Sequence, residues 1–323
     1  MKGVVIHHDD QDGRMGGYIM IKYLKSQGYD NVISMEADYK SKLDFSAVES
    51  DDKVVIVDFS LDKGQMEDLQ RHVDSSNIIW IDHHKSALEK YPEQANLDGI
   101  RFVGLAGCEL AYIYSQGYRI KHDDKAVNIN NSGDMEFTSI DRIEIPEPIR
   151  MIGDWDVWRQ TPNSREVAFS LRADWPKSCL ENPGGIEYWE AYMENPTVLH
   201  SHFVRGAAIL SYVYGKGETD LKEYGYQVRI RKFEDLEAIA INSADRSSLV
   251  FESVLDKYEV GIVYNYTESV ENGKVMTFSI YRLKKNADKD IDVSFIAKSF
   301  GGGGHHDAAG WTSTGALPFT LKI

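Results

Sequence analysis

Three short runs of consecutive apolar residues constrain the fold of this chain more than any other feature. They cover residues 3–6, 54–57 and 78–81. A stretch at 16–26 with the apolar spacing of a helix follows the first run, and Ser60 is a candidate cap for a helix after the second. Continuous apolar strands that alternate with helices are typical of a parallel sheet. The sequence therefore predicts an α/β fold whose N-terminal domain is a parallel sheet with helices on both faces.

Each of these runs is followed directly by acidic or histidine residues. They are His8, Asp10, Asp12 and Gly13 in a His-x-Asp-x-Asp-Gly motif, Asp58, and the triplet Asp82, His83 and His84. The carboxyl ends of parallel strands share one edge of the sheet, and ligands bind at that edge in open α/β folds. We expect His8, Asp10 and Asp12 to alternate along an extended segment and so to converge.

Carboxylates and imidazoles in this arrangement favour a divalent metal site. Hard oxygen ligands with an imidazole suit Mn²⁺ or Mg²⁺. Two adjacent metal ions need a bridging carboxylate, for which Asp58 is placed, and Asp154 can supply a further ligand. Each motif taken alone has another interpretation: an acidic loop at 10–12, a helix-capping Asp58, and a surface turn at 83–84.

The length of the chain predicts two domains. It has 323 residues, more than one hydrophobic core usually serves. We expect a catalytic domain at 1–160, an excursion with a linker helix at 161–225, and a smaller C-terminal α/β domain at 226–323. Prolines and glycines interrupt the pattern after residue 161, and the helix that joins the halves is predicted near 197–214.

A run of four glycines at 301–304, followed by His305, is the main feature of the C-terminal part. Glycine lets a phosphate or a base approach the backbone N–H groups closely. A flexible linker is the alternative interpretation. The run continues into Ala308, Ala309 and Gly310, and these small residues indicate tight packing or close ligand approach.

The charge balance bears on the kind of substrate. The formal net charge is −15, whereas proteins that grip long nucleic acids present a basic face to the phosphates. We therefore expect a short substrate and no long nucleic acid. The chain turns polar early and has no long apolar run, which predicts a cytoplasmic protein without membrane association. Its two cysteines, Cys108 and Cys179, are far apart, and we expect reduced thiols.

Taken together, these motifs resemble a known family. The triplet Asp82-His83-His84, with the His8 motif, Asp58 and Asp154, is similar to the DHH phosphoesterase superfamily. The glycine run with His305 and its small residues looks like the signature of the DHH-associated C-terminal substrate domain. The branch that the chain resembles is the oligoribonuclease (nanoRNase) and cyclic-nucleotide phosphodiesterase-like group.

The resemblance implies a role for each motif residue. Two Mn²⁺ ions per chain, with Mg²⁺ or another divalent ion as the alternative, would be held by His8, Asp10, Asp12, Asp58, His83 and Asp154. Asp82 would orient an imidazole, Asp58 would bridge the metals, and His84 would contact the scissile phosphate or protonate the leaving oxygen. The substrate would be bound by Arg282, Gly302, Gly303, Gly304 and His305.

The function predicted from this reasoning is metal-dependent hydrolysis of phosphodiester bonds, or of terminal phosphates, in short oligonucleotides or cyclic (di)nucleotides. A single-strand-specific exonuclease is one alternative. A catalytically inactive nucleotide-binding regulator is another, although every expected ligand type is present. Whether the chain forms a homodimer is left open by the sequence.

Overall fold

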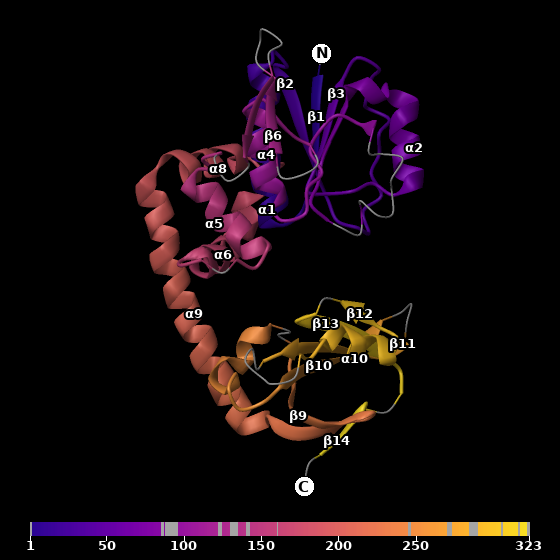
Figure 1. The fold of residues 1–323 in the computed structure, drawn as a ribbon, viewed down its shortest axis with the longest axis vertical. Coiled ribbons are helices and arrows are strands. Elements are labelled where there is room, and N and C mark those ends of the chain that lie inside the picture. The colour runs from indigo at the N-terminus through magenta and orange to yellow at the C-terminus, as the bar shows by residue number, and fades with distance from the viewer. Residues whose placement is uncertain are drawn as a thin grey trace. The chain divides into compact units, whose positions relative to one another are not determined.

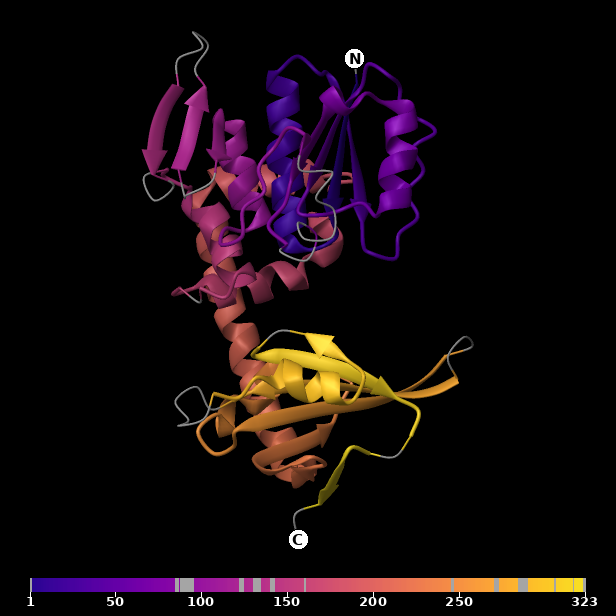
Figure 2. The same cartoon turned by 45° about the vertical axis from the view of Figure 1, so that its right-hand side comes forward.

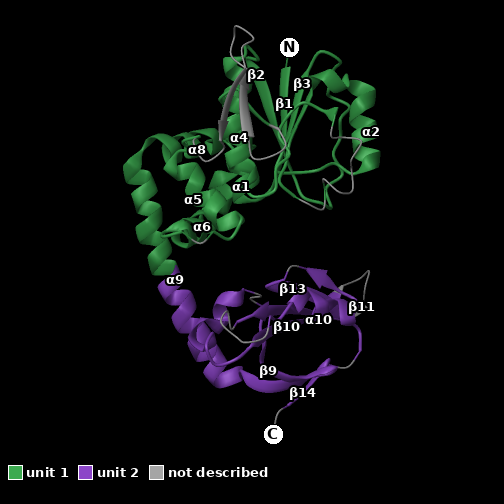
Figure 3. Ribbon diagram, viewed as in Figure 1, with its two compact units in different colours: residues 1–209 green, residues 210–323 purple. Residues whose placement is uncertain are grey.

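The computed structural model divides into two compact units, residues 1–209 and 210–323 (Figure 3). The structure describes residues 2–84, 87, 96–121, 125–129, 135–139, 143–159, 161–244, 247–269, 273–283, 290–304, 306–315 and 317–321. Each unit has its own sheet and its own buried core.

The sheet of the first unit has four strands in the order β2-β1-β3-β4, and every pairing is parallel. The strands are β1 (Lys2–His8), β2 (Asn31–Ala37), β3 (Lys53–Val57) and β4 (Ile78–Ile81). The three apolar runs form β1, β3 and β4 side by side, which confirms the predicted parallel sheet.

Helices cover both faces of this sheet, as predicted (Figure 1). On one face, α1 (Gln11–Ser26) and α4 (Gly107–Ser115) pack against Val5 and Val55. On the other, α2 (Lys63–His72) packs against Val54 and its neighbours. Successive strand residues point to opposite faces, so β1 and β3 contribute to both cores and need apolar residues throughout.

The start of α1 differs from the prediction. The helix begins at Gln11 because the Asp10 side chain caps it, accepting a hydrogen bond from the Gly13 amide at 2.9 Å. Asp12 therefore lies in the first helical turn, and the predicted extended segment through His8, Asp10 and Asp12 is wrong. Likewise Asp62, rather than Ser60, caps α2.

The segment predicted as an excursion is largely helical. It contains α6 (Ser164–Ala173), α7 (Trp175–Ser178), α8 (Gly185–Glu194) and α9 (Pro196–Tyr224), and it follows α5 (Glu147–Asp156). A small antiparallel sheet of β5 (Tyr118–Lys121), β6 (Lys125–Ile129) and β7 (Met135–Ser139) lies beside α4 (Figure 2).

Helix α9 is 29 residues long, extends beyond the predicted 197–214 at both ends, and contains the boundary between the units. Across the part of the chain that the structure describes, no helix combines the length and the apolar character that a membrane span requires.

The second unit contains a mixed sheet of seven strands in the order β12-β13-β11-β10-β9-β8-β14. Only the β9–β10 pair is parallel among the pairings of the described residues. The 3-10 helix η4 (Ser248–Val254) and α10 (Val293–Ser299) pack on it. The strands are β8 (Tyr226–Ile230), β9 (Phe233–Asn242), β10 (Val260–Ser269), β11 (Gly273–Arg282), β12 (Gly303–Gly304), β13 (Ala308–Ser313) and β14 (Phe319–Leu321).

Candidate metal centre

Acidic and histidine side chains converge at the carboxyl edge of the parallel sheet. They form three overlapping groups in which the possible ligand atoms lie within 4.8 Å of one another. Asp58 belongs to two of the groups and His83 to two. The groups are Asp58, His83 and His84; His8, Asp10 and Asp58; and Asp12, His83 and Asp156.

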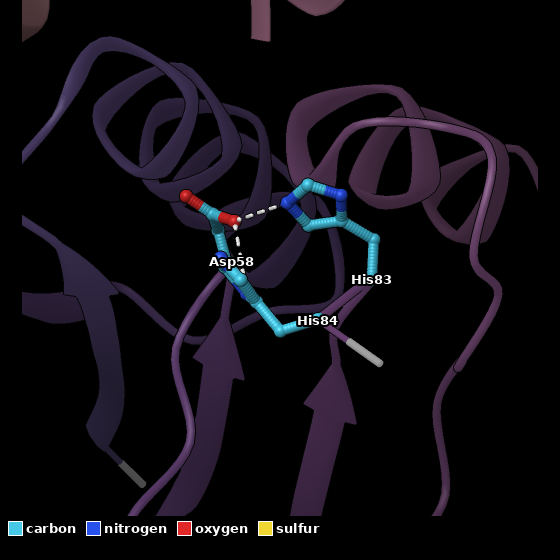
Figure 4. Close-up of side chains that lie close together, drawn as sticks. All are labelled: Asp58, His83 and His84. Carbon is cyan, nitrogen blue, oxygen red and sulfur yellow. Dashed lines mark ion pairs between the residues drawn. The ribbon is translucent and has the colours of Figure 1, made fainter. Parts of the chain in front are cut away.

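Asp58 lies at the centre of this arrangement. It follows β3, is 1% exposed, and adopts a left-handed backbone conformation with φ 54°, which costs energy for a residue with a Cβ atom. Its amide donates to the Ile81 carbonyl at 2.9 Å, so the neighbouring strand holds it in place. Its Oδ1 lies 3.1 Å from Nε2 of His83 and 3.9 Å from Nδ1 of His84 (Figure 4).

The N-terminus of α4 holds the Asp12 carboxylate. The Gly107 amide donates to Oδ2 of Asp12 at 2.7 Å, and the Cys108 amide donates to Oδ1 at 2.7 Å. Amides at a helix N-terminus favour a negative charge, because they have no partner within the helix and carry the positive end of its dipole. Asp12 is 2% exposed, so its position is fixed by these contacts.

Asp82 orients the two histidines that follow it. Its Oδ1 accepts hydrogen bonds from the His83 amide at 2.8 Å, the His84 amide at 3.1 Å and Nδ1 of His84 at 2.8 Å. Because Nδ1 of His84 is bonded to Asp82, Nε2 is the ring nitrogen that can contact another group. Elsewhere in the cluster, Nδ1 of His8 lies 2.7 Å from Oδ2 of Asp10.

The structure separates the two aspartates of α5. Oδ2 of Asp156 lies 3.4 Å from Nε2 of His83, which brings it into the cluster. Asp154, the ligand expected from the sequence, is outside the three groups: it pairs with Nε of Arg159 and accepts a hydrogen bond from the Thr161 hydroxyl. Asp156 is therefore the candidate ligand that the geometry favours.

Burial and mutual repulsion control the protonation of the carboxylates. Burial, and then the charges of Asp12 and Asp10, raise the pKa of Asp156 to about 8. Burial and the neighbouring Asp12 likewise raise the pKa of Asp58 well above its ordinary value. Deprotonating the whole cluster is therefore costly unless a cation compensates the negative charge.

The pKa values of the neighbouring His83 and His84 are shifted in opposite directions. Burial lowers the pKa of His83 and favours its neutral form, which is the form that ligates a metal. Burial is the largest single influence on His84 and lowers its pKa, but the hydrogen bond to Asp82 and the charges of Asp82, Asp156 and Asp12 together outweigh it and raise the pKa of His84. The neutral form of His83 suits a metal ligand, whereas the protonated form of His84 suits a proton donor.

The donor set fits a divalent cation. Oδ1 of Asp58 and Oδ2 of Asp82 are buried and accept no hydrogen bond from the described residues. Buried carboxylate oxygens normally have a partner, and a missing partner at such a site is explained by an ion or a water. Oxygen and imidazole donors from β1, α1, β3, β4 and α5 suit a hard or borderline divalent ion.

Tyr39 borders the cluster and was not singled out from the sequence. Its ring is 60% exposed, and its centroid lies 5.0 Å from that of Phe59, 5.5 Å from that of His8 and 6.5 Å from that of His84. It follows β2, a parallel strand that ends at the same edge as the others. The sequence has no continuous apolar run before Tyr39, because polar residues interrupt β2, an edge strand that is only partly buried.

The predicted substrate residues lie in the second unit. Nη1 of Arg282 lies 3.1 Å from Asp290 and 3.3 Å from Asp307. Gly303 and Gly304 form β12, and Gly302 precedes it. A Cβ atom on Gly302 would lie 2.1 Å from the Gly310 carbonyl oxygen, so this glycine is needed for strand packing. His305 lies outside the described residues.

No protein-family model matches the chain, and no curated protein matches it. Solved structures do. The DHH domain of a member of a ribosomal-protein family is 14% identical with a TM-score of 0.52, covering 96% of this chain and 82% of that one. A pGpG-specific phosphodiesterase from Vibrio cholerae is 10% identical with a TM-score of 0.49, covering 97% and 93%. RecJ from Thermus thermophilus in complex with Mn²⁺ is 13% identical with a TM-score of 0.46, covering 96% and 49%.

The chain therefore has the fold of the DHH-domain proteins. At 14% identity, the likeness concerns the architecture alone. The residues that suggested the DHH superfamily, from His8 through Asp58 to the Asp82-His83-His84 triplet, lie together at one edge of this fold. The predicted fold is confirmed, and the oligoribonuclease-like branch stays a prediction.

Proposed function

We propose that the chain is a metal-dependent phosphoesterase that hydrolyses phosphodiester bonds, or terminal phosphates, of short oligonucleotides or cyclic (di)nucleotides. The observation that carries this proposal is the sharing of Asp58 and His83 among three groups of possible ligands. Shared ligands are what two neighbouring metal ions require, and a two-metal site is suited to in-line displacement at phosphorus. Two Mn²⁺ ions, or Mg²⁺ in their place, would fit the donor set.

The ligands we assign are His8, Asp10, Asp12, Asp58, His83 and Asp156. When bound, the metal pair supplies Lewis acidity and activates a water molecule. Asp58 would contribute to both ion sites, since it belongs to two groups. Asp154, the sixth ligand expected from the sequence, would instead support the site through Arg159.

His84 is the proton donor in this proposal. Oδ1 of Asp82 accepts its Nδ1–H, which fixes the ring and leaves Nε2 to face the leaving oxygen. The raised pKa of His84 favours the protonated imidazole that can act as a proton donor. Water adds to phosphorus and releases a proton to the solvent while the bond from phosphorus to the leaving oxygen breaks. His84 supplies the proton that this oxygen takes up and then regains a proton from the solvent.

The substrate class rests on charge and on resemblance. A net charge of −15 disfavours a grip on long nucleic acid, and the glycine run with Arg282 is the part of the second unit that we assign to phosphate binding. Strongly salt-dependent degradation of long single strands would instead favour the exonuclease alternative.

The test is turnover of a substrate panel with Mn²⁺ or Mg²⁺: RNA oligomers of a few nucleotides, cyclic mono- and dinucleotides, 3′-phosphoadenosine 5′-phosphate and long single-stranded DNA. Asp58→Asn should reduce turnover by more than the roughly 10- to 100-fold typical of losing an outer partner of a ligand. Asp52→Asn is the matched control, because Asp52 is also buried and hydrogen-bonded but lies outside the cluster. A metal-loaded protein that turns over none of these substrates would contradict the proposal.

A further inference from the structure

We propose that Arg159 is a positioning residue that sets the metal affinity of the centre by clamping the N-terminus of α4 to α5. This inference rests on the proposed metal site. Arg159 belongs to none of the three ligand groups of the described residues, and it touches the cluster only through other side chains.

The N-terminus of α4 contacts two proposed ligands. Its first amides, from Gly107 and Cys108, hold both oxygens of Asp12. Gly107 also packs on Asp58 so closely that a Cβ atom on Gly107 would lie 2.9 Å from Cγ of Asp58. A shift of this helix end would therefore move both carboxylates.

Glu109 fixes that helix end. Its Oε2 accepts a hydrogen bond from the Ala106 amide at 2.9 Å, which closes the first turn of α4. Glu109 is 2% exposed, and burial raises the pKa of its carboxyl even with Arg159 as a partner. A buried carboxylate of this kind depends on a compensating cation, because an unpaired buried charge is strongly destabilising.

Arg159 supplies that cation and joins it to two further segments. Its Nη2 donates to Oε1 of Glu109 at 2.6 Å, its Nη1 donates to the Gly104 carbonyl at 3.2 Å, and its Nε pairs with Asp154. Asp154 lies on α5, two residues before the proposed ligand Asp156. One rigid, planar guanidinium thus connects the loop before α4, the cap of α4 and the helix that carries Asp156.

Packing around this connection leaves little freedom. A Cβ atom on Gly153 of α5 would lie 2.6 Å from Cδ of Glu109, so the two helices meet at this carboxylate. Without Arg159, Glu109 would lose its charge partner and would have to move, protonate or admit water. A movement of Glu109 would release the Ala106 amide and loosen the end of α4, whose next amides hold Asp12.

Arg159→Gln removes the clamp and should weaken Mn²⁺ binding by about 10- to 100-fold, the range typical for outer partners of metal ligands. Arg159→Lys keeps the positive charge but lacks the planar guanidinium with its several N–H donors. Its Mn²⁺ affinity should therefore fall between those of the wild type and Arg159→Gln. Glu109→Gln, which removes the buried charge but keeps an acceptor for the Ala106 amide, should weaken binding by less than Arg159→Gln.

Arg205→Gln is the matched control. Arg205 also makes forked contacts in the first unit, with Ser170 and Asp174, but bonds to no member of the three ligand groups among the described residues. Its loss should lower thermal stability while leaving Mn²⁺ affinity unchanged within about twofold. The readout is a calorimetric Mn²⁺ isotherm on the full chain, with the melting temperature of each metal-free variant measured alongside.

An Arg159→Gln variant that binds Mn²⁺ as tightly as the wild type would overturn the inference and leave the proposed function intact. If such a variant also has a raised KM, Arg159 contacts the substrate instead. If Arg159→Gln does not fold, the isotherm of Arg159→Lys decides in the same way. No Mn²⁺ binding by the wild type would contradict the proposed metal site and this inference together.

Discussion

A Cβ atom on Gly107 would lie 2.5 Å from Cβ of Asp58, closer than real Cβ atoms approach one another. Glycine suits the first position of α4, because Asp58, the central carboxylate of the candidate metal centre, occupies the space of a side chain. This contact makes the α4 N-terminus part of the site, together with its hydrogen bonds to Asp12.

Gly107→Ala should therefore displace Asp58 or α4 and weaken Mn²⁺ binding by at least about tenfold. Calorimetric titration of metal-free protein measures the effect. Gly215→Ala is the control: a Cβ atom at Gly215, on α9, would meet nothing within 4 Å, and alanine should stabilise a helix interior by roughly 0.5–1 kcal/mol. Unchanged Mn²⁺ affinity in Gly107→Ala would show that the close approach has no role in the centre.

The two aspartates of α5 should respond differently to substitution. Asp156→Asn should weaken Mn²⁺ binding and leave unchanged or raise the melting temperature of the metal-free protein, because it removes a carboxylate that its neighbours repel. Asp154→Asn should mainly lower the melting temperature, because Asp154 is 2% exposed and pairs with Arg159. Metal titration and thermal unfolding of both variants test this, and a stronger loss of metal affinity in Asp154→Asn would restore Asp154 as the ligand.

The pattern of apolar residues predicted much of this centre. Asp58 and the triplet after β4 follow fully apolar strands, and parallel pairing necessarily brings their carboxyl ends together. Local capping was harder to foresee: the Asp10 side chain starts α1 five residues before the apolar spacing indicates, and so places Asp12 on a helix.

The choice between Asp154 and Asp156 could not be made from the sequence. On an α-helix, residues two positions apart point about 200° apart around the axis, so only one of the two can face the cluster. Which one does so depends on how α5 packs against α4, and the close contact of Gly153 with Glu109 is part of that packing. Such tertiary contacts leave no local signal in the chain.

Tyr39 should contribute to substrate binding. Its exposed ring borders His8 and His84. Beside the proposed phosphoesterase site, an aromatic ring can stack on a base of the substrate, a contact worth roughly 1–3 kcal/mol. Tyr39→Ala should raise KM at least about fivefold at unchanged Mn²⁺ affinity, whereas Tyr39→Phe should preserve KM. Tyr212→Ala, at a 71% exposed tyrosine of α9, is the control. Equal KM values in wild type and Tyr39→Ala would contradict a substrate contact.

The buried His202 should make the first unit sensitive to acid. It lies on α9, is 3% exposed, and has its Nδ1 2.9 Å from Oγ of Ser170. Burial, and then the charge of Arg205, lower the pKa of His202 to about 4, although Asp174 acts in the opposite direction.

The unfolded chain, with an ordinary histidine pKa near 6.5, takes up a proton before the folded chain does. The free energy of unfolding should therefore be unaffected by His202 above pH 6.5, and should fall as the pH drops from about 6.5 through 4. The full difference is on the order of 3 kcal/mol. His7 is also buried with a pKa lowered to about 4 and acts in the same window, so only a comparison of variants isolates His202.

His202→Gln keeps a polar partner for Ser170 without a titrating ring. Urea unfolding of wild type and His202→Gln between pH 4 and 8, with metal removed, should show a shallower loss of stability in the variant below pH 6.5. The variant lacks the His202 contribution, while the other histidines and the carboxylates titrate in both proteins. Parallel pH profiles of the two proteins would mean that the folded chain accommodates the charged imidazole through Asp174, whose carboxylate pairs with Arg205 nearby.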